Sequence, residues 1–379
     1  MISRLTGIIG DDDFEPGALS FNRRILEIEK RQRRDGSHDY IFPGFIDLQV
    51  NGAYGIDVMS ASVEELLELS HCLAHEGTTG WLPTVITSPL DQVERCDAII
   101  AEAMAAQADQ ERATSAGSRT LAGASILGMH LEGPFISPRR LGVHPALNLL
   151  PQGEALEWVL QLKSLKLLTL APELEGALDA IRMLTERGVA VSIGHTDATY
   201  EQAAAGVEAG ARMFTHVFNA MRPFHHREPG SVGAALTLPG VFPALIADGV
   251  HVHPAALGIA RRWGAFLTTD RVALAGAKGV SMPLFGGLVT LARIDNGAAR
   301  LPDGTLAGSI ITMLESVRTM IKHGLMNDWS IRRRTSEAAA EVLGLKDRGK
   351  IKSRARADLI LVDPGLNIKA VFVGGRELD

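Results

Sequence analysis

The chain has 379 residues, of which 46% are hydrophobic and 22% are charged, and its formal net charge is -6. This length accommodates a (β/α) barrel of about 250 residues and a smaller second unit, and the negative charge excludes the clustered basic face of a nucleic-acid-binding protein. The chain holds only two cysteines, Cys72 and Cys96, and no uninterrupted apolar run of about 18 residues. We therefore expect a soluble, cytoplasmic protein with no disulfide framework and no nucleic-acid or membrane partner.

Both ends of the chain predict short β-strands. Residues 1–42 hold short alternating segments separated by turns, and residues 357–363 and 370–374 have the same character near the C-terminus. We expect residues 1–42 and 350–379 to form one small β-sandwich domain. Residues 43–349 then form the main domain.

The main domain alternates between strand and helix patterns. Ser62 and Glu65 have the spacing of a capping box that begins a helix ending near Gly77, a second helix is expected over residues 89–106, and residues 110–122 predict a loop. Two strands are expected to end at Asn51 and Thr84. Six more are expected within residues 125–132, 166–173, 189–195, 212–219, 243–251 and 265–270. Eight strands joined by helices predict a parallel (β/α)8 barrel of the TIM type.

The first barrel strand ends in polar side chains at alternate positions. Asp47, Gln49 and Asn51 share one face of this strand, and active sites of such barrels assemble at the C-terminal ends of the strands. The run at residues 43–47, PGFID, resembles the first-strand signature of the amidohydrolase superfamily. Gln49 and Asn51 stand where that signature usually has two histidines. With this difference the segment resembles the N-acetylglucosamine-6-phosphate deacetylase family, in particular the branch that keeps one metal ion. An amide oxygen is a weaker ligand than imidazole, so we expect a single ion.

Three candidate metal ligands lie at the ends of three other strands. Glu132 ends the third strand, His195 the fifth and His216 the sixth. A single histidine at a strand end is more often a core or rim residue than a ligand. Two imidazoles and one carboxylate, however, make up the ligand set of a catalytic zinc site. We expect these three residues to bind one divalent ion, with zinc the best candidate.

The eighth strand is expected to supply a general base. Residues 268–270 followed by Ala275 and Gly276 resemble the family segment that carries the catalytic aspartate, which assigns Asp270 as general base and acid. A second register aligns residues 271–274 with the strand instead. It places Gly276 or Ala277 where the aspartate belongs and predicts an inactive protein.

The resemblance also assigns residues to substrate binding. Asn219 and Ala220 match a family segment that holds phosphate oxygens, and Arg227 supplies a cationic fork that reaches a neighbouring subunit's site in relatives. His251 is expected to contact the sugar, and His144 to lie beside the substrate carbonyl and take part in catalysis. The segment at residues 306–309 also has a counterpart in the family.

The activity that the resemblance implies is metal-dependent removal of the acetyl group from N-acetylglucosamine 6-phosphate by a homodimeric hydrolase. One alternative is a deacetylase of another amino-sugar phosphate, such as the galactosamine epimer. An enzyme acting on a cyclic amide fits less well, because such relatives carry the two-histidine first strand. The alternative from another class is a barrel that binds a metal or a sugar phosphate without turnover.

Overall fold

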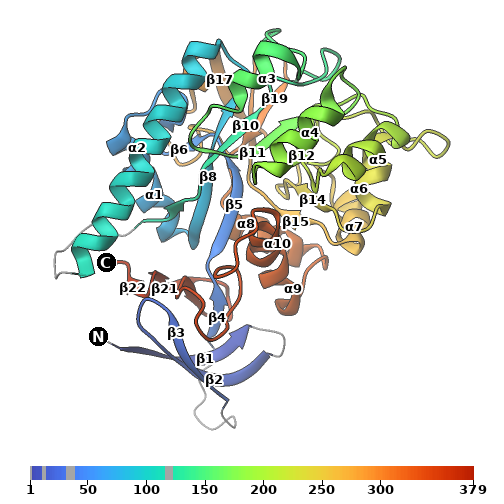
Figure 1. Ribbon diagram of the computed structural model, residues 1–379. Helices are drawn as coiled ribbons and strands as arrows, with labels where there is room; N and C mark the ends of the chain where they lie inside the picture. Colours follow the sequence, from blue (N-terminus) through green and yellow to red (C-terminus); the bar gives the residue numbers. More distant parts are fainter. Residues whose placement is uncertain (1, 11–13, 31–38, 116–122) are drawn as a thin grey trace.

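The computed structural model describes residues 2–10, 14–30, 39–115 and 123–379. Strands from the two ends of the chain form one sheet, and the residues between them form a barrel surrounded by helices (Figure 1). Among the described residues, no helix combines the length and apolar character needed to span a membrane.

The terminal sheet unites strands that lie more than 300 residues apart in the sequence. Its order is β22-β21-β20-β4-β1-β2-β3, so C-terminal strand β20 pairs antiparallel with β4. Leu19, Phe21, Ile25 and Phe372 are buried in a separate apolar cluster at this sheet. The expected joining of the two termini into one small unit is confirmed. Its strands are β1 (Ser3–Gly10), β2 (Phe14–Phe21), β3 (Ile25–Lys30), β4 (Tyr40–Pro43), β20 (Leu359–Val362), β21 (Ile368–Val373) and β22 (Arg376–Glu377).

The barrel has the eight parallel strands that the sequence predicts. Their spatial order follows the chain, and an additional short strand, β9 (Ser125–Ile126), also pairs with β8. The barrel strands are β5 (Phe45–Val50), β8 (Thr78–Ile86), β10 (Met129–Glu132), β11 (Leu165–Leu170), β12 (Ala190–Ile193), β13 (Met213–Phe214), β14 (Phe242–Leu245) and β15 (Phe266–Leu267).

Helices connect and enclose these strands (Figure 1). Helix α1 begins with the predicted capping box, in which the Ser62 hydroxyl accepts from the Glu65 amide and the Glu65 carboxylate accepts from the Ser62 amide. The helices before the eighth strand are α1 (Val63–His75), α2 (Leu90–Ser115), α3 (Gly153–Val159), α4 (Ala177–Glu186), α5 (Tyr200–Ala209), α6 (Gly230–Thr237) and α7 (Pro254–Ala260). Helix α2 continues to Ser115, so the loop prediction is wrong for residues 110–115, and residues 116–122 lie outside the described part of the chain.

The remaining elements follow the eighth strand. Helices α8 (Met313–Lys322), α9 (Asp328–Arg332) and α10 (Ala338–Val342) come last, with the short helix η3 (Arg333–Glu337) between α9 and α10. Buried Ala338 and Ala339 pack with Ile46 and Phe266 near the starts of β5 and β15, which closes the end of the barrel opposite the strands' C-termini.

The first and eighth strands meet through a small number of hydrogen bonds. The Asp270 amide donates to the Gln49 carbonyl at 3.0 Å, and the Asn51 amide donates to the Arg271 carbonyl at 2.8 Å. The buried Asp47 carboxylate accepts from both the Thr268 and Thr269 hydroxyls, at 2.8 and 2.6 Å. We call these contacts the closing seam, because they join the two ends of the barrel sheet.

Two small sheets lie outside the barrel. One is the hairpin of β6 (Gly52–Ala53) and β7 (Ile56–Asp57), directly after the first barrel strand. The other is an antiparallel sheet of β16 (Ser281–Leu284), β17 (Val289–Asp295), β18 (Ala298–Arg300) and β19 (Leu306–Ser309), with the short helix η2 (Phe285–Gly287) between its first two strands. The sheet brings residues 305–308 to the mouth of the barrel.

Candidate active site

A pocket of about 230 Å³ opens at the C-terminal ends of the barrel strands. Every residue predicted for the site lines it except Arg227. The lining residues are Asn51, Ile86, Glu132, Gly142, Val143, His144, His195, His216, Asn219, Ala220, His251, Asp270, Phe285, Thr305, Leu306, Ala307 and Gly308.

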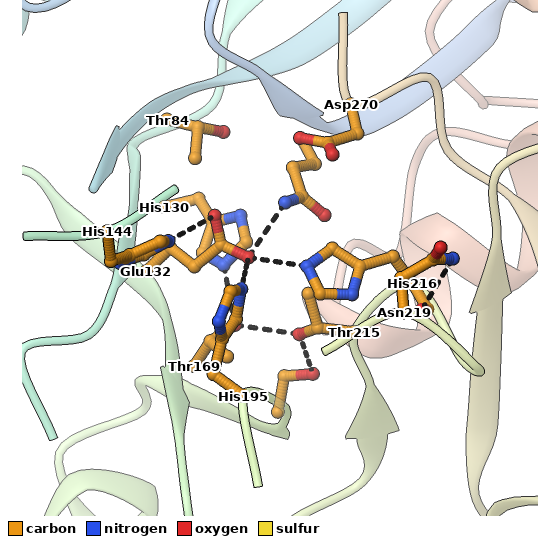
Figure 2. A network of polar contacts seen from close by, with 12 residues as sticks. Thr84, His130, Glu132, His144, Thr169, His195, Thr215, His216, Asn219 and Asp270 are labelled. Atoms are coloured by element: carbon orange, nitrogen blue, oxygen red, sulfur yellow. Dashed lines mark hydrogen bonds and ion pairs between the residues drawn. The ribbon is translucent and has the colours of Figure 1, made fainter. Parts of the chain in front are cut away.

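Glu132 lies at the centre of this pocket, and three imidazoles point toward it (Figure 2). Its Oε1 atom lies 2.8 Å from His216 Nε2 and 3.2 Å from His195 Nε2. Its Oε2 atom lies 3.6 Å from His144 Nε2. The three predicted ligands, which come from three different strand ends, are thus brought together.

The charge state of Glu132 is set by these neighbours. Burial alone would raise the pKa of this carboxyl, but His195, and then His144 and His216, hold the pKa well below its ordinary value. Glu132 is therefore an anion in a site where exposure of the side chain is only 4%. A buried anion needs a nearby cation or several hydrogen-bond donors.

The protonation of His195 tests whether a metal ion fits here. Its Nδ1 atom lies 2.9 Å from the backbone carbonyl oxygen of Arg140, which only accepts hydrogen bonds, so the ring proton lies on Nδ1. Nε2 is then the ring nitrogen that faces the Glu132 carboxylate, 3.2 Å from Oε1. An imidazole nitrogen and a carboxylate oxygen that approach each other in this way can bind one cation between them. Two imidazole nitrogens and a carboxylate oxygen are suitable ligands for such an ion.

His144 is a further residue within reach of this centre. Among the described residues, the ligand atoms that all lie within 4.8 Å of one another belong to Glu132, His144 and His195. This group contains His144 in place of the predicted ligand His216, which contacts Glu132 at 2.8 Å. His144 Nδ1 lies 3.0 Å from the Thr87 hydroxyl and accepts from the Thr87 amide at 3.4 Å, so the ring proton is assigned to Nε2, which lies on the side of Glu132 and the pocket. Burial, together with the nearby His195, lowers the pKa of His144 to about 4, so the ring is neutral.

Asp270 lies across the pocket from the histidines, beside Asn51. The Asn51 side-chain amide donates to Asp270 Oδ1 at 2.8 Å. Burial, followed by the charge of Glu132, raises the pKa of Asp270 to about 6. Gly276 instead lies against the ring of Tyr54 and does not line the pocket, so the structure has the first of the two registers considered for the eighth strand.

The predicted substrate-binding residues divide into two groups. Asn219, Ala220 and His251 line the pocket, and His251 is held by Asp248, whose Oδ2 atom lies 2.6 Å from its Nδ1. Arg227 lies outside the pocket lining on an exposed loop, where its guanidinium contacts His226 at 3.1 Å. Within this chain, Arg227 is not part of the site.

Several pocket residues have a left-handed backbone. Among the described non-glycine residues with positive φ, five line the pocket. They are His195, His216, Ala220, Asp270 and Phe285. Such conformations cost about 1–3 kcal/mol each and persist where the surrounding structure imposes them, most often at functional sites.

Comparison with known proteins identifies the family. Residues 40–378 match the amidohydrolase family. The chain belongs to the amidohydrolase family.

Individual amidohydrolases resemble the chain over nearly its whole length. The N-acetylglucosamine-6-phosphate deacetylase of Bacillus subtilis is 37% identical over 364 residues, which cover 94% of this chain and 88% of the relative. The N-acetylgalactosamine-6-phosphate deacetylase of Escherichia coli O157:H7 is 34% identical over 346 residues, which cover 89% of this chain and 87% of the relative. A solved structure of a mutant N-acetyl-D-glucosamine-6-phosphate deacetylase from Mycobacterium smegmatis, in complex with N-acetyl-D-glucosamine-6-phosphate, has a TM-score of 0.87 and 29% identity, with 99% of each chain covered.

In this amidohydrolase, the two amides of the first strand have partners that the sequence did not reveal. The Gln49 side-chain amide donates to Glu132 Oε1 at 2.9 Å, and Asn51 donates to Asp270. Their alternation on the first strand showed that they face the barrel mouth, but the contacts join residues 83 and 219 positions apart. Asp248 was missed in the same way, although its position three residues before His251 was a usable signal.

Proposed function

We propose that this hydrolase removes the acetyl group from N-acetylglucosamine 6-phosphate and releases glucosamine 6-phosphate and acetate, using one divalent metal ion, zinc. The observation that carries the proposal is the arrangement of Glu132, His195 and His216 around one point, with Asp270 beside them in the same pocket. The relatives named as deacetylases of this substrate class support it.

Glu132, His195 and His216 would hold the ion. A divalent ion in this site supplies a bound water whose pKa is lowered toward neutrality. Gln49 does not supply a second imidazole; instead its amide donates to Glu132 and restrains that carboxylate. We therefore expect one ion per chain.

Asp270 moves the proton. Its carboxylate takes a proton from the attacking water, and it then gives that proton to the amine nitrogen of the leaving sugar. Asn51 fixes one carboxylate oxygen with a hydrogen bond at 2.8 Å, so the other oxygen remains available for this transfer.

His144 and the rest of the lining bind the substrate. The Nε2–H group of His144 faces the pocket and donates a hydrogen bond to the acetamide oxygen as negative charge develops on it. His251, held in place by Asp248, contacts the sugar hydroxyls. Asn219 and the Ala220 amide bind phosphate oxygens.

We also propose that the enzyme is a homodimer in which Arg227 serves the neighbouring subunit's site. The substrate carries a phosphate dianion, yet no lysine or arginine is present among the described residues that line the pocket. Arg227 is exposed, as a residue that reaches another chain must be. Both cysteines are free, which supports a reducing, cytoplasmic setting.

The same pocket supports a second candidate substrate, the galactosamine epimer, because one relative at 34% identity is named as a deacetylase of N-acetylgalactosamine 6-phosphate. The two sugars differ only at C4. The test is acetate release from both phosphorylated epimers and from unphosphorylated N-acetylglucosamine, each with the zinc-loaded and the chelated protein. Zinc-dependent turnover with a higher kcat/KM for the glucosamine epimer supports the main proposal. A preference for the other epimer selects the second candidate, and no turnover of any of them indicates a binding protein.

A further inference from the structure

The loop of residues 137–144 follows the third barrel strand and carries Gly142, Val143 and His144 into the pocket. Two hydrogen bonds at His195, which follows strand β12, hold this loop: one to its backbone and one from its ring. The Ser137 amide donates to the His195 carbonyl at 2.8 Å, and His195 Nδ1–H donates to the Arg140 carbonyl at 2.9 Å. The imidazole that faces Glu132 therefore takes its orientation from this loop.

The Arg140 side chain is anchored to Asp197, two residues beyond His195. Its Nε and Nη2 atoms donate to Asp197 Oδ1 at 2.9 and 2.7 Å. The Asp197 side chain is 12% exposed. The backbone amide of Asp197 donates to Glu173 Oε1 at 2.6 Å, so Asp197 is itself held in place. Two charge-assisted hydrogen bonds from one guanidinium to a single carboxylate oxygen fix the position of the Arg140 side chain.

Two further arginines approach the same carboxylate. Arg139 lies 3.3 Å and Arg222 lies 3.2 Å from Asp197 Oδ2. Arg139 is 78% exposed, whereas Arg140 is 29% exposed. Arg139 thus contacts the same anion as Arg140, but the structure shows no bond from its carbonyl to His195, which makes it a matched control.

We infer that Arg140 and Asp197 are positioning residues for the metal centre: their ion pair holds the Arg140 carbonyl against His195 Nδ1 and so fixes the tautomer and ring direction that present Nε2 to the ion. This inference rests on the proposed function of Glu132, His195 and His216 as metal ligands. Neither Arg140 nor Asp197 is among the described residues that line the pocket. Partners of this kind behind a ligating histidine typically change metal affinity about 10–100-fold when they are removed.

The direction in which one substitution changes zinc affinity distinguishes a positioning role from a purely electrostatic effect. Arg140→Met keeps the aliphatic part of the side chain and removes a positive charge near the metal centre. If only charge mattered, the variant would bind zinc more tightly than the wild type. Positioning predicts the opposite, because the freed loop no longer holds its carbonyl against the His195 ring.

The experiment measures zinc dissociation constants of the metal-free wild type, Arg140→Met, Asp197→Asn, the double variant and Arg139→Met, by competition with a chelator. Thermal unfolding of each metal-free protein shows whether it is folded. We expect about 10–100-fold weaker zinc binding in both single variants, no further loss in the double variant, and less than about 3-fold change in Arg139→Met. Nitrogen-15 NMR of labelled histidine is expected to show one sharp Nδ1–H signal for His195 in the zinc-loaded wild type and a shifted, broadened signal in zinc-loaded Arg140→Met, because the carbonyl that accepts from Nδ1 is no longer held.

Unchanged or tighter zinc binding by a folded Arg140→Met variant would overturn the inference, as would an equal loss in Arg139→Met. If Asp197→Asn does not fold, Arg140→Met and its control decide the matter. A wild-type protein that binds no zinc would instead refute the proposed metal function on which the inference rests.

Discussion

Asp270 combines features that a general base in this site requires. It borders the pocket, one of its oxygens is fixed by Asn51, and burial raises its pKa to about 6 in the metal-free protein. Its positive φ of 50° is imposed by the closing seam, where its amide donates to the Gln49 carbonyl. The residue is held in place by the contacts that join the first and eighth strands.

Replacement of Asp270 by Asn is expected to lower kcat about 10²–10⁴-fold, because the amide cannot take up the proton of the attacking water. The variant should still bind zinc, since Asp270 is not among the proposed ligands, and it should not be less stable than the wild type, because burial raises the pKa of Asp270 and so disfavours its charged form. Acetate-release kinetics measure the effect, and Asp179→Asn, on the exposed side of helix α4, is the matched control. A variant with near wild-type kcat would remove Asp270 from the mechanism.

The closing seam between β5 and β15 includes one buried carboxylate, that of Asp47, beside its two backbone hydrogen bonds. Asp47→Ala removes the acceptor of the Thr268 and Thr269 hydroxyls and is expected to cost about 3 kcal/mol of unfolding free energy. Asp47→Asn keeps one acceptor oxygen and is expected to cost about 1 kcal/mol. Urea denaturation of the metal-free proteins measures both. Equal stability of wild type and Asp47→Ala would show that the seam does not depend on this residue.

A buried aspartate in the hairpin after β5 is expected to make the stability of the protein depend on pH. Asp57, at the end of β7, accepts from the Met59 and Gly286 amides, at 2.9 and 3.3 Å, yet burial raises its pKa to about 6. Between about pH 4 and pH 6 the unfolded chain releases this proton before the folded protein does, so stability falls as pH rises. From a folded pKa of about 6 and an unfolded value near 3.9, the loss approaches about 3 kcal/mol by pH 7.

Asp57→Asn lacks this titration. The unfolding free energy of wild type minus that of Asp57→Asn should therefore fall between pH 4 and pH 7, measured by urea denaturation without metal. The comparison of slopes cancels the constant effect of losing one acceptor oxygen. Parallel pH profiles would show that Asp57 does not titrate in this range.

The elements that the sequence predicted well are those defined by local pattern. All eight strands were found because each ends in an apolar run followed by polar residues, and the capping box at Ser62 began its helix as expected. The end of helix α2 was not predictable from local sequence. In its last turns, Glu111 pairs with the Arg356 guanidinium, which lies 245 residues later in the chain, beside the terminal sheet. Arg356 is itself held by Asp358. Long-range packing extended a helix where composition favoured a loop.

At the scale of the whole molecule, the site could be predicted in part for the same reason. Glu132, His195 and His216 stand at strand ends, and a parallel barrel brings strand ends together. Other contacts depend on how the loops fold over the barrel. They are the approach of His144 to the metal cluster, the contact of Asp248 with His251 and that of the Arg140 carbonyl with His195. The pattern of a strand does not determine those contacts.

The proposed dimer predicts complementation between two defective chains. Asp270→Asn lacks the base and Arg227→Ala lacks the phosphate contact, but in a mixed dimer the site of the Arg227→Ala chain has its own Asp270 and receives Arg227 from the partner. Co-refolding the two variants in equal amounts should restore about a quarter of wild-type turnover. Turnover no higher than the mean of the separate variants would place Arg227 outside the neighbouring site.

Deacetylation in this pocket is expected to depend on a single bound metal ion, and a zinc titration measures that dependence. Zinc is added in steps to the chelated wild-type protein while bound metal and acetate release from N-acetylglucosamine 6-phosphate are measured in the same samples. Turnover should be absent without metal, should rise in proportion to bound zinc and should level off at one ion per chain. Full turnover by the metal-free protein, or a rise that continues to two ions per chain, would rule out a single catalytic ion.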